Sequence, residues 1–294
     1  MRAEQYFIDL YRKDLNNTIS LLRNKFSINY EYYHKLINDF LIDNNGYIEF
    51  SLTISDTPNV RFFFVYYDDK KQEWIKNNID NILKNNLDDE SYNKTKKALD
   101  IFKKTDTEGF ITYGADITAS YFKLYFVSKK LNNCLDKLGK LFDFPVKKDL
   151  ENFDMIGLNV YKDKIDIKLY LVYNSPAKDK LFKYYKPVHE LENWNKYVNN
   201  IETFISILPQ YDYKASIAYP TLFNENCKKK LQEIPQSKGI FLNSNIYPTW
   251  LGFNDKAKLS TIYFRPKRDY TFKVNDNEDI VFKDKDCKDY QNIK

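Results

Sequence analysis

The sequence is poor in glycine, proline, cysteine and histidine, and each shortage argues against a class of protein. Only 7 of the 294 residues are glycine and 9 are proline, and neither the glycine-rich dinucleotide-binding motif nor the P-loop motif occurs. Two histidines and three scattered cysteines support neither a zinc cluster nor a disulfide framework. Three unpaired cysteines favour the reducing cytoplasm. These residues are His34, His189, Cys134, Cys227 and Cys287.

The chain also lacks long hydrophobic runs. Its longest apolar runs, such as 62–67, have the length of a strand and are far too short to span a membrane. The opening residues, MRAEQYFIDLYRKD, contain no apolar stretch before a cleavage site, so we expect no signal peptide. A net charge of +5, from 46 basic and 41 acidic residues, gives no argument for nucleic acid. We therefore expect a soluble, cytoplasmic protein that binds neither membrane nor nucleic acid.

Aromatic residues, in contrast, are abundant: 25 tyrosines, 22 phenylalanines and 3 tryptophans make up 17% of the chain. This content excludes disorder and favours a β-rich fold. Apolar residues at helical spacing predict an amphipathic helix over 3–26 and another over 30–42. The period then changes to two, which predicts five hairpins at 46–67, 109–128, 153–173, 202–219 and 247–265. Helices are expected between the hairpins, at 70–104, 130–142, 177–200 and 223–234.

The second strands of these hairpins are similar to one another. They contain, in order, Arg61, Lys123-Leu124-Tyr125, Lys168-Leu169-Tyr170, Lys214-Ala215-Ser216 and Tyr263-Phe264-Arg265. The first residues of these groups lie 62, 45, 46 and 49 positions apart, and a strand–strand–helix unit that recurs at such intervals indicates a repeat architecture. Five hairpins supply ten antiparallel strands, which can close into a barrel with helices outside.

We therefore predict an α+β fold in which a single barrel domain covers residues 1–294. N-terminal helices would occupy 1–45, hairpin–helix repeats 46–268 and a charged, irregular tail 269–294. Because a closed barrel leaves no free sheet edge that demands a partner, we expect a monomer.

Alternation within the predicted strands distinguishes their two faces. Over 164–172 the isoleucines and leucines share one face, whereas Asp166, Lys168 and Tyr170 share the other. The amphipathic helices need an apolar surface to cover, so the apolar strand face is expected to point outward to them. The charged and tyrosine-rich face would then line the barrel interior. In an open sheet beneath helices, the same face would simply lie in water.

Five cations are expected to converge at one depth of that interior: Arg61, Lys123, Lys168, Lys214 and Arg265. Like charges repel, so their convergence favours a polyanionic ligand such as a diphosphate. Tyrosines on the same face can donate hydrogen bonds to phosphate and stabilise a carbocation with their rings. These tyrosines are Tyr125, Tyr170 and Tyr263. Both properties suit ionisation of an allylic diphosphate. A single lysine, taken alone, fits a solvated strand face better; the indication comes from the recurrence.

Glu49 is the carboxylate on the predicted inner face of the first strand. A turn centred on residue 57 would place Glu49 across from Val65, and Arg61 across from Thr53. In a partly desolvated interior, a carboxylate can act as general base toward a phenol, indole or amide proton. A structural ion pair between Glu49 and another barrel lysine fits the spacing equally well.

Several segments resemble the cyanobactin-type peptide prenyltransferases, which have the ABBA fold. IEFSLTI followed by VRFFFVYYDDKKQEW resembles the first repeat of that family. DMIGLNVY with KIDIKLYLVY resembles the third repeat, and IYPTWLGF before LSTIYFRP the last. YKASIAYP, in the fourth repeat, departs most from the family pattern. There Tyr219 competes with Lys214 as the site residue, although its alternation places it on the outer face.

The resemblance implies transfer of a dimethylallyl or geranyl group from its diphosphate to a ribosomally made peptide, linear or cyclic. A Tyr or Trp side chain is the first acceptor to consider, ahead of His, Arg or a chain terminus. Glu49 matches the family's acceptor-contacting glutamate, and Arg61 and Lys123 match its diphosphate-binding positions. The lining continues at Lys168, Tyr170, Tyr263 and Arg265. Trp250 matches an aromatic position that could stack on acceptor or prenyl chain, although a core tryptophan is the simpler interpretation.

Magnesium often assists in this family. The sequence contains no D-D-x-x-D motif, so no aspartate metal cage is expected, and Mg²⁺ would be carried by the diphosphate. Two alternatives remain open. The first is the same fold acting on a small phenol, indole or free amino acid. The second is a non-catalytic barrel that binds anionic ligands or single-stranded nucleic acid. A buried Glu49 would argue against the second, because a polyanion-binding surface gains nothing from it.

Overall fold

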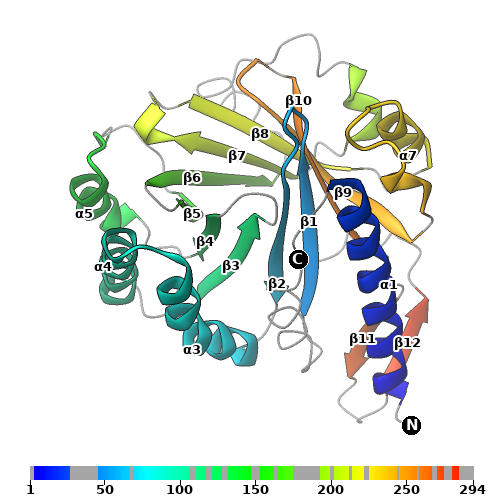
Figure 1. The fold of residues 1–294 in the computed structure, drawn as a ribbon, viewed down its shortest axis with the longest axis horizontal. Coiled ribbons are helices and arrows are strands. Elements are labelled where there is room, and N and C mark those ends of the chain that lie inside the picture. The colour runs from blue at the N-terminus through cyan, green and yellow to red at the C-terminus, as the bar shows by residue number, and fades with distance from the viewer. Residues whose placement is uncertain are drawn as a thin grey trace.

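Ten antiparallel strands close into a barrel (Figure 1). The computed structural model describes residues 3–26, 46–66, 69–105, 110–116, 121–127, 132–146, 153–161, 164–174, 193–198, 202–211, 214–221, 225–243, 245–256, 258–266, 270–274 and 280–284. The barrel strands are β1 (Gly46–Thr53), β2 (Val60–Tyr66), β3 (Phe110–Asp116), β4 (Tyr121–Val127), β5 (Met155–Val160), β6 (Ile165–Asn174), β7 (Glu202–Leu208), β8 (Lys214–Pro220), β9 (Ile246–Phe253) and β10 (Leu259–Pro266). Each strand pairs with its neighbour in sequence, and β1 pairs with β10 to complete the ring. The predicted barrel is confirmed.

Five helices of the described chain lie outside this ring (Figure 1). They are α1 (Ala3–Phe26), α3 (Asp69–Asn86), α4 (Asp89–Thr105), α5 (Asn132–Phe142) and α7 (Glu225–Gln232). The helix expected over 70–104 is therefore two helices. The second of them is capped where it begins, because the Ser91 backbone N–H donates to Asp88 Oδ1 at 2.8 Å.

Two further expected helices lie wholly or largely outside the described residues. The one at 30–42 is not described at all. Of 177–200 only 193–198 is described, and it contains the short 3-10 helix η2 (Asn195–Tyr197).

The apolar face of the strands points outward, against the helices. Phe126 of β4 stacks on Phe102 of α4, with ring centroids 3.6 Å apart. Phe264 of β10 meets Phe241 of the 3-10 helix η4 (Ile240–Leu242) at 5.7 Å. Phe50, on the same face of β1, is fully buried. Burial of a side chain of this kind contributes about 1.5–3 kcal/mol, so the hydrophobic core is a shell between strands and helices.

The charged tail is not irregular throughout, and that expectation was wrong. β11 (Tyr270–Val274) and β12 (Ile280–Asp284) form a two-stranded antiparallel sheet in which Phe272 lies opposite Phe282. Apolar residues alternate along β11, as they do in strands, whereas the apolar residues of β12 are consecutive. The many charges of the tail obscured this period in the sequence.

No helix of the described chain is both long enough and apolar enough to cross a membrane. Cys134 and Cys227 are fully buried. Cys287 and the two histidines lie outside the described residues.

Candidate active site inside the barrel

The register of the first hairpin determines which residues face the barrel interior. Glu49 of β1 lies opposite Phe63 of β2, and Ser51 lies opposite Arg61. The expected pairing of Glu49 with Val65 was therefore wrong by two residues. Because side chains alternate with a period of two, this shift leaves every residue on its predicted face.

Three of the predicted cations come together inside the barrel: Arg61 on β2, Lys123 on β4 and Lys168 on β6. Lys123 is only 9% exposed. Burial, together with the charges of Arg61 and Lys168, holds the pKa of Lys123 well below its usual value. Burial and the charge of Arg61 lower the pKa of Lys168 to about 8. Strands β2 and β6 are not adjacent in the ring, so Arg61 and Lys168 influence each other across the interior.

The carboxylates near this cluster have other partners. Arg61 Nε lies 3.4 Å from Oδ2 of the buried Asp116. The Tyr211 hydroxyl donates to Asp166 Oδ1 at 2.8 Å, and Lys164 Nζ lies 3.4 Å from Oδ2 of the same residue.

The buried Lys123 and the half-buried Lys168 are consequently left without a counter-charge in contact. In the described part of the chain, neither Lys123 nor Lys168 has an ion pair with a carboxylate. Their Nζ atoms instead lie 5.8 Å from the ring of Tyr125 and 5.5 Å from the ring of Tyr170, respectively. The interior therefore holds two lysines whose charged form is not stabilised by a carboxylate in contact.

An aromatic wall adjoins the cations. The rings of Tyr125 and Tyr170 lie 5.9 Å apart, and Phe63 lies 6.4 Å from Tyr125 and 6.2 Å from Tyr263. Burial is the main cause that raises the pKa of all three tyrosines, so their hydroxyls remain neutral hydrogen-bond donors. The ring of Tyr170 packs against Gly157, where a Cβ would lie only 3.0 Å from Tyr170 Cε2.

Glu49 lies beside this wall and is 6% exposed. Burial raises the pKa of Glu49 to about 7, although the Thr249 hydroxyl and the charge of Arg265 both act to lower it. The Thr249 hydroxyl donates to Glu49 Oε1. Among the described residues no lysine forms an ion pair with Glu49, which disfavours the structural ion pair left open by the sequence. A carboxyl group with this pKa can accept or release a proton near neutral pH.

Lys214 does not join the interior cations. Lys214, at the start of β8, has a side chain that is 52% exposed and lies 3.4 Å from Asp255 in an ion pair. Arg265, near the end of β10, lies close enough to Glu49 for its charge to lower the pKa of that carboxyl group. The expectation that Lys214 joins the other cations inside the barrel was therefore wrong, because Lys214 lies at the surface beside Asp255.

Trp250 and Tyr219 occupy opposite faces of the wall. Trp250 pairs with the inward-facing Tyr263, and its ring lies 4.8 Å from Phe204 at 79°. It thus faces the interior rather than the helical shell. Tyr219 packs on the outward-facing Phe253, at 6.1 Å, as its alternation predicts.

The described residues contain no group of three or more His, Cys, Asp or Glu side chains placed to hold a metal ion. Arg61, Lys123 and Lys168 would repel a free divalent cation. The described residues therefore do not fit a protein-bound Mg²⁺.

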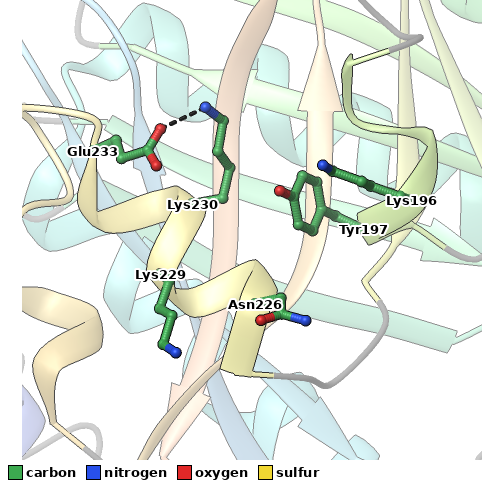
Figure 2. A pocket seen from close by; sticks show the side chains of 6 residues that line it. All are labelled: Lys196, Tyr197, Asn226, Lys229, Lys230 and Glu233. Carbon is green, nitrogen blue, oxygen red and sulfur yellow. Dashed lines mark hydrogen bonds and ion pairs between the residues drawn. The ribbon is translucent and has the colours of Figure 1, made fainter.

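A second hollow lies outside the barrel, between η2 and α7, and Figure 2 shows it. It has a volume of about 440 Å³ and is lined by Lys196, Tyr197, Asn226, Lys229, Lys230 and Glu233. Lys230 forms an ion pair with Glu233. Exposed lysines around an open hollow are typical of a solvated surface. The barrel interior, with its buried uncompensated charge, is the stronger candidate.

This barrel and its surrounding helices have the ABBA prenyltransferase fold. Three solved structures share it. The prenyltransferase PriB, in a ternary complex with L-tryptophan and dimethylallyl thiolodiphosphate, has a TM-score of 0.60 and 9% identity, over 87% of this chain and 96% of its own. A 6-dimethylallyl tryptophan synthase has a TM-score of 0.61 and 10% identity, over 87% of this chain and 95% of its own. NotF, in complex with brevianamide F and DMSPP, has a TM-score of 0.58 and 9% identity, over 87% of this chain and 94% of its own.

At this identity the likeness establishes the fold alone. No protein-family model matches the sequence, and no curated protein does. The resemblance to the cyanobactin-type family is thus not confirmed.

Proposed function

We propose that the protein is a prenyltransferase that moves a dimethylallyl or geranyl group from its diphosphate to a small aromatic acceptor, such as tryptophan or another indole. The observation that carries this proposal is the pair of lysines inside the barrel, the buried Lys123 and the half-buried Lys168, which lie beside Arg61 without a carboxylate in contact. A cluster of this kind is stabilised by a bound polyanion. Solved structures of the same fold contain dimethylallyl thiolodiphosphate or diphosphate, which supports a diphosphate as that anion.

In the first step the bond between the allylic carbon and the diphosphate oxygen breaks, and its electron pair leaves with the diphosphate. Arg61, Lys123 and Lys168 are proposed to neutralise the charge that develops on this leaving group. Preorganised cations in a site that excludes water are the most effective form of such stabilisation.

The allyl cation is then held between aromatic rings. Tyr125, Tyr170 and Tyr263 present π-faces to it, and each such contact is worth about 0.5–2 kcal/mol. The same rings keep water from capturing the cation. Their hydroxyls stay protonated because burial raises each pKa.

The acceptor attacks the cation with its ring electrons, forming a carbon–carbon bond, and then loses a proton to Glu49. Burial gives Glu49 a pKa of about 7, which suits a base at neutral pH. Trp250, on the inner face next to Tyr263, is proposed to stack on the acceptor. Lys214 takes no part in this scheme, because its exposed side chain forms an ion pair with Asp255.

A peptide acceptor is the second candidate. It is supported by the likeness of the first, third and last repeats to peptide prenyltransferases. The same reaction in the barrel interior would also prenylate a Trp or Tyr side chain within a peptide. Cytoplasmic location and a monomeric state also stay predictions.

The test is to incubate the full chain with dimethylallyl or geranyl diphosphate and with tryptophan, indole, phenols, or Trp- and Tyr-containing peptides. We expect a mass gain of one prenyl unit on an aromatic acceptor. Glu49→Gln is expected to lower kcat by about 10²-fold or more without weakening donor binding. Lys123→Met is expected to weaken donor binding by about 10- to 100-fold, and Lys94→Met, an exposed lysine on α4, to leave it unchanged. Donor binding without product would favour the non-catalytic barrel, and no donor binding would overturn the proposal.

A further inference from the structure

Strand β9 contains one more residue than its partner β10 near the site. Trp250 pairs with Tyr263 and Pro248 pairs with Phe264, which leaves Thr249 without a partner in the ladder. One unpaired residue of this kind is a β-bulge. Pro248 is consistent with it, because proline has no N–H for the ladder and within sheets is confined to edges and bulges.

The bulge is held from the end of β8. The Thr221 backbone N–H donates to the carbonyl oxygen of Thr249 at 2.8 Å. The hydroxyl of the buried Thr221 donates to the carbonyl oxygen of Pro248 at 2.5 Å. Both carbonyls of the irregular stretch are therefore anchored, so its conformation is well defined.

The bulge changes which side chains face the interior. In a regular strand consecutive residues point to opposite faces, so an inward Trp250 would require an outward Thr249. Here the Thr249 hydroxyl instead reaches Glu49 Oε1. Strands β9 and β1 are separated in the ring by β10, so this contact passes over β10 on the inner side.

We propose that Thr249, turned inward by the bulge, is a positioning residue that orients the Glu49 carboxylate by occupying Oε1 and presenting Oε2 to the acceptor proton. This inference rests on the proposed function, in which Glu49 is the base. The inference adds to that function a residue, Thr249, that determines which oxygen of Glu49 takes the proton and how readily Glu49 ionises.

The groups that face Glu49 determine how this contact can be measured. Thr249 approaches from β9, Arg265 and Tyr263 from β10, and Tyr125 from β4. The hydroxyl of Thr249 and the charge of Arg265 favour the ionised carboxylate, whereas burial favours the protonated form. Removing the hydroxyl alone therefore raises the pKa of Glu49, and leaves less of the base ionised at neutral pH.

The test uses the full chain and three variants. Thr249→Val keeps the shape without the hydroxyl, Thr249→Ser keeps the hydroxyl, and Thr203→Val makes the same change at a buried threonine on β7, away from Glu49. For Thr249→Val we expect the acid limb of the pH profile of kcat/KM to move up by about one pH unit and kcat at pH 7 to fall about fivefold, because the ionised fraction of Glu49 drops from about one half to about one tenth. The donor KM should not change. Thr249→Ser should restore both, and Thr203→Val should match the unmodified chain.

A second measurement does not need turnover. The infrared band of the Glu49 carboxyl group, assigned by its loss in Glu49→Gln, is titrated in the unmodified chain and in Thr249→Val. An upward move of its midpoint in Thr249→Val supports the positioning role, even where no acceptor is found and the proposed function fails. An unchanged midpoint, or an unchanged pH profile in an active enzyme, overturns the role of Thr249 and leaves the prenyltransferase proposal intact.

Discussion

Donor binding is predicted to depend on pH through Lys168, and the dependence follows from the structure. Burial and the neighbouring Arg61 lower the pKa of Lys168 from 10.5 to about 8. This difference corresponds to roughly 3 kcal/mol between the charged and neutral forms, since one pKa unit is about 1.4 kcal/mol. A bound diphosphate favours the ammonium and raises that pKa again. Donor binding above pH 8 must therefore take up a proton.

The expected result is a donor dissociation constant that rises by up to about tenfold per pH unit above pH 8. The diphosphate of the donor ester is already fully ionised there, because the last phosphate pKa is near 6. Isothermal titration calorimetry with dimethylallyl diphosphate, in two buffers of different ionisation enthalpy, measures both the affinity and the proton uptake. Lys168→Met is the variant to compare, and it should bind more weakly with a shallower pH dependence.

The same lysine should affect folding with the opposite sign. The unfolded chain keeps the ordinary pKa near 10.5, while the folded chain has a pKa of about 8, so the unfolded state binds more protons between these values. The free energy of unfolding should therefore rise with pH over this window. Donor affinity that is constant from pH 7 to 9.5, or that changes equally in Lys168→Met, would show that Lys168 is not in the donor site.

Three further predictions concern neighbouring residues. Gly157→Ala should displace the Tyr170 ring, because its Cβ would lie 3.0 Å from that ring, and should lower kcat more than donor affinity in a steady-state assay. Asp116→Asn removes the buried partner of Arg61 and should lower the free energy of unfolding by about 2 kcal/mol in urea titrations; a change under about 0.5 kcal/mol would contradict a structural role. Trp250→Leu should raise the acceptor KM with the donor KM unchanged, and equal changes in both would place Trp250 elsewhere than on the acceptor.

The faces of the strands were predictable from local pattern. Phe50, Phe126 and Phe264 are outward and buried under helices, as their alternation predicts. The predicted register of the first hairpin paired Glu49 with Val65, whereas the structure pairs it with Phe63. Because the error is two residues, each side chain still lies on its predicted face. Alternation depends only on neighbours along the chain, and for that reason the sequence records it directly.

Other features of the site had only weak signals. Nothing in the sequence pointed to Asp116 as the partner of Arg61, because a carboxylate at the end of a strand is common. Pro248 inside a strand is a signal for a bulge, but it does not say which residue is turned inward or what that residue meets. Lys214 matched the repeat and yet lies at the rim, because position within a repeat does not measure depth in a barrel.

The ten barrel strands, and the placement of polar residues on the face that lies away from the helical shell, could be predicted from the sequence. These follow from periodicity and hydrophobicity, which are properties of neighbouring residues. Only the tertiary structure decided that Arg61, Lys123 and Lys168 meet without a carboxylate for each, and that Thr249 reaches Glu49 across an intervening strand. Closure of the ring brings together strands far apart in the chain, and burial there shifts charge states that no local pattern encodes.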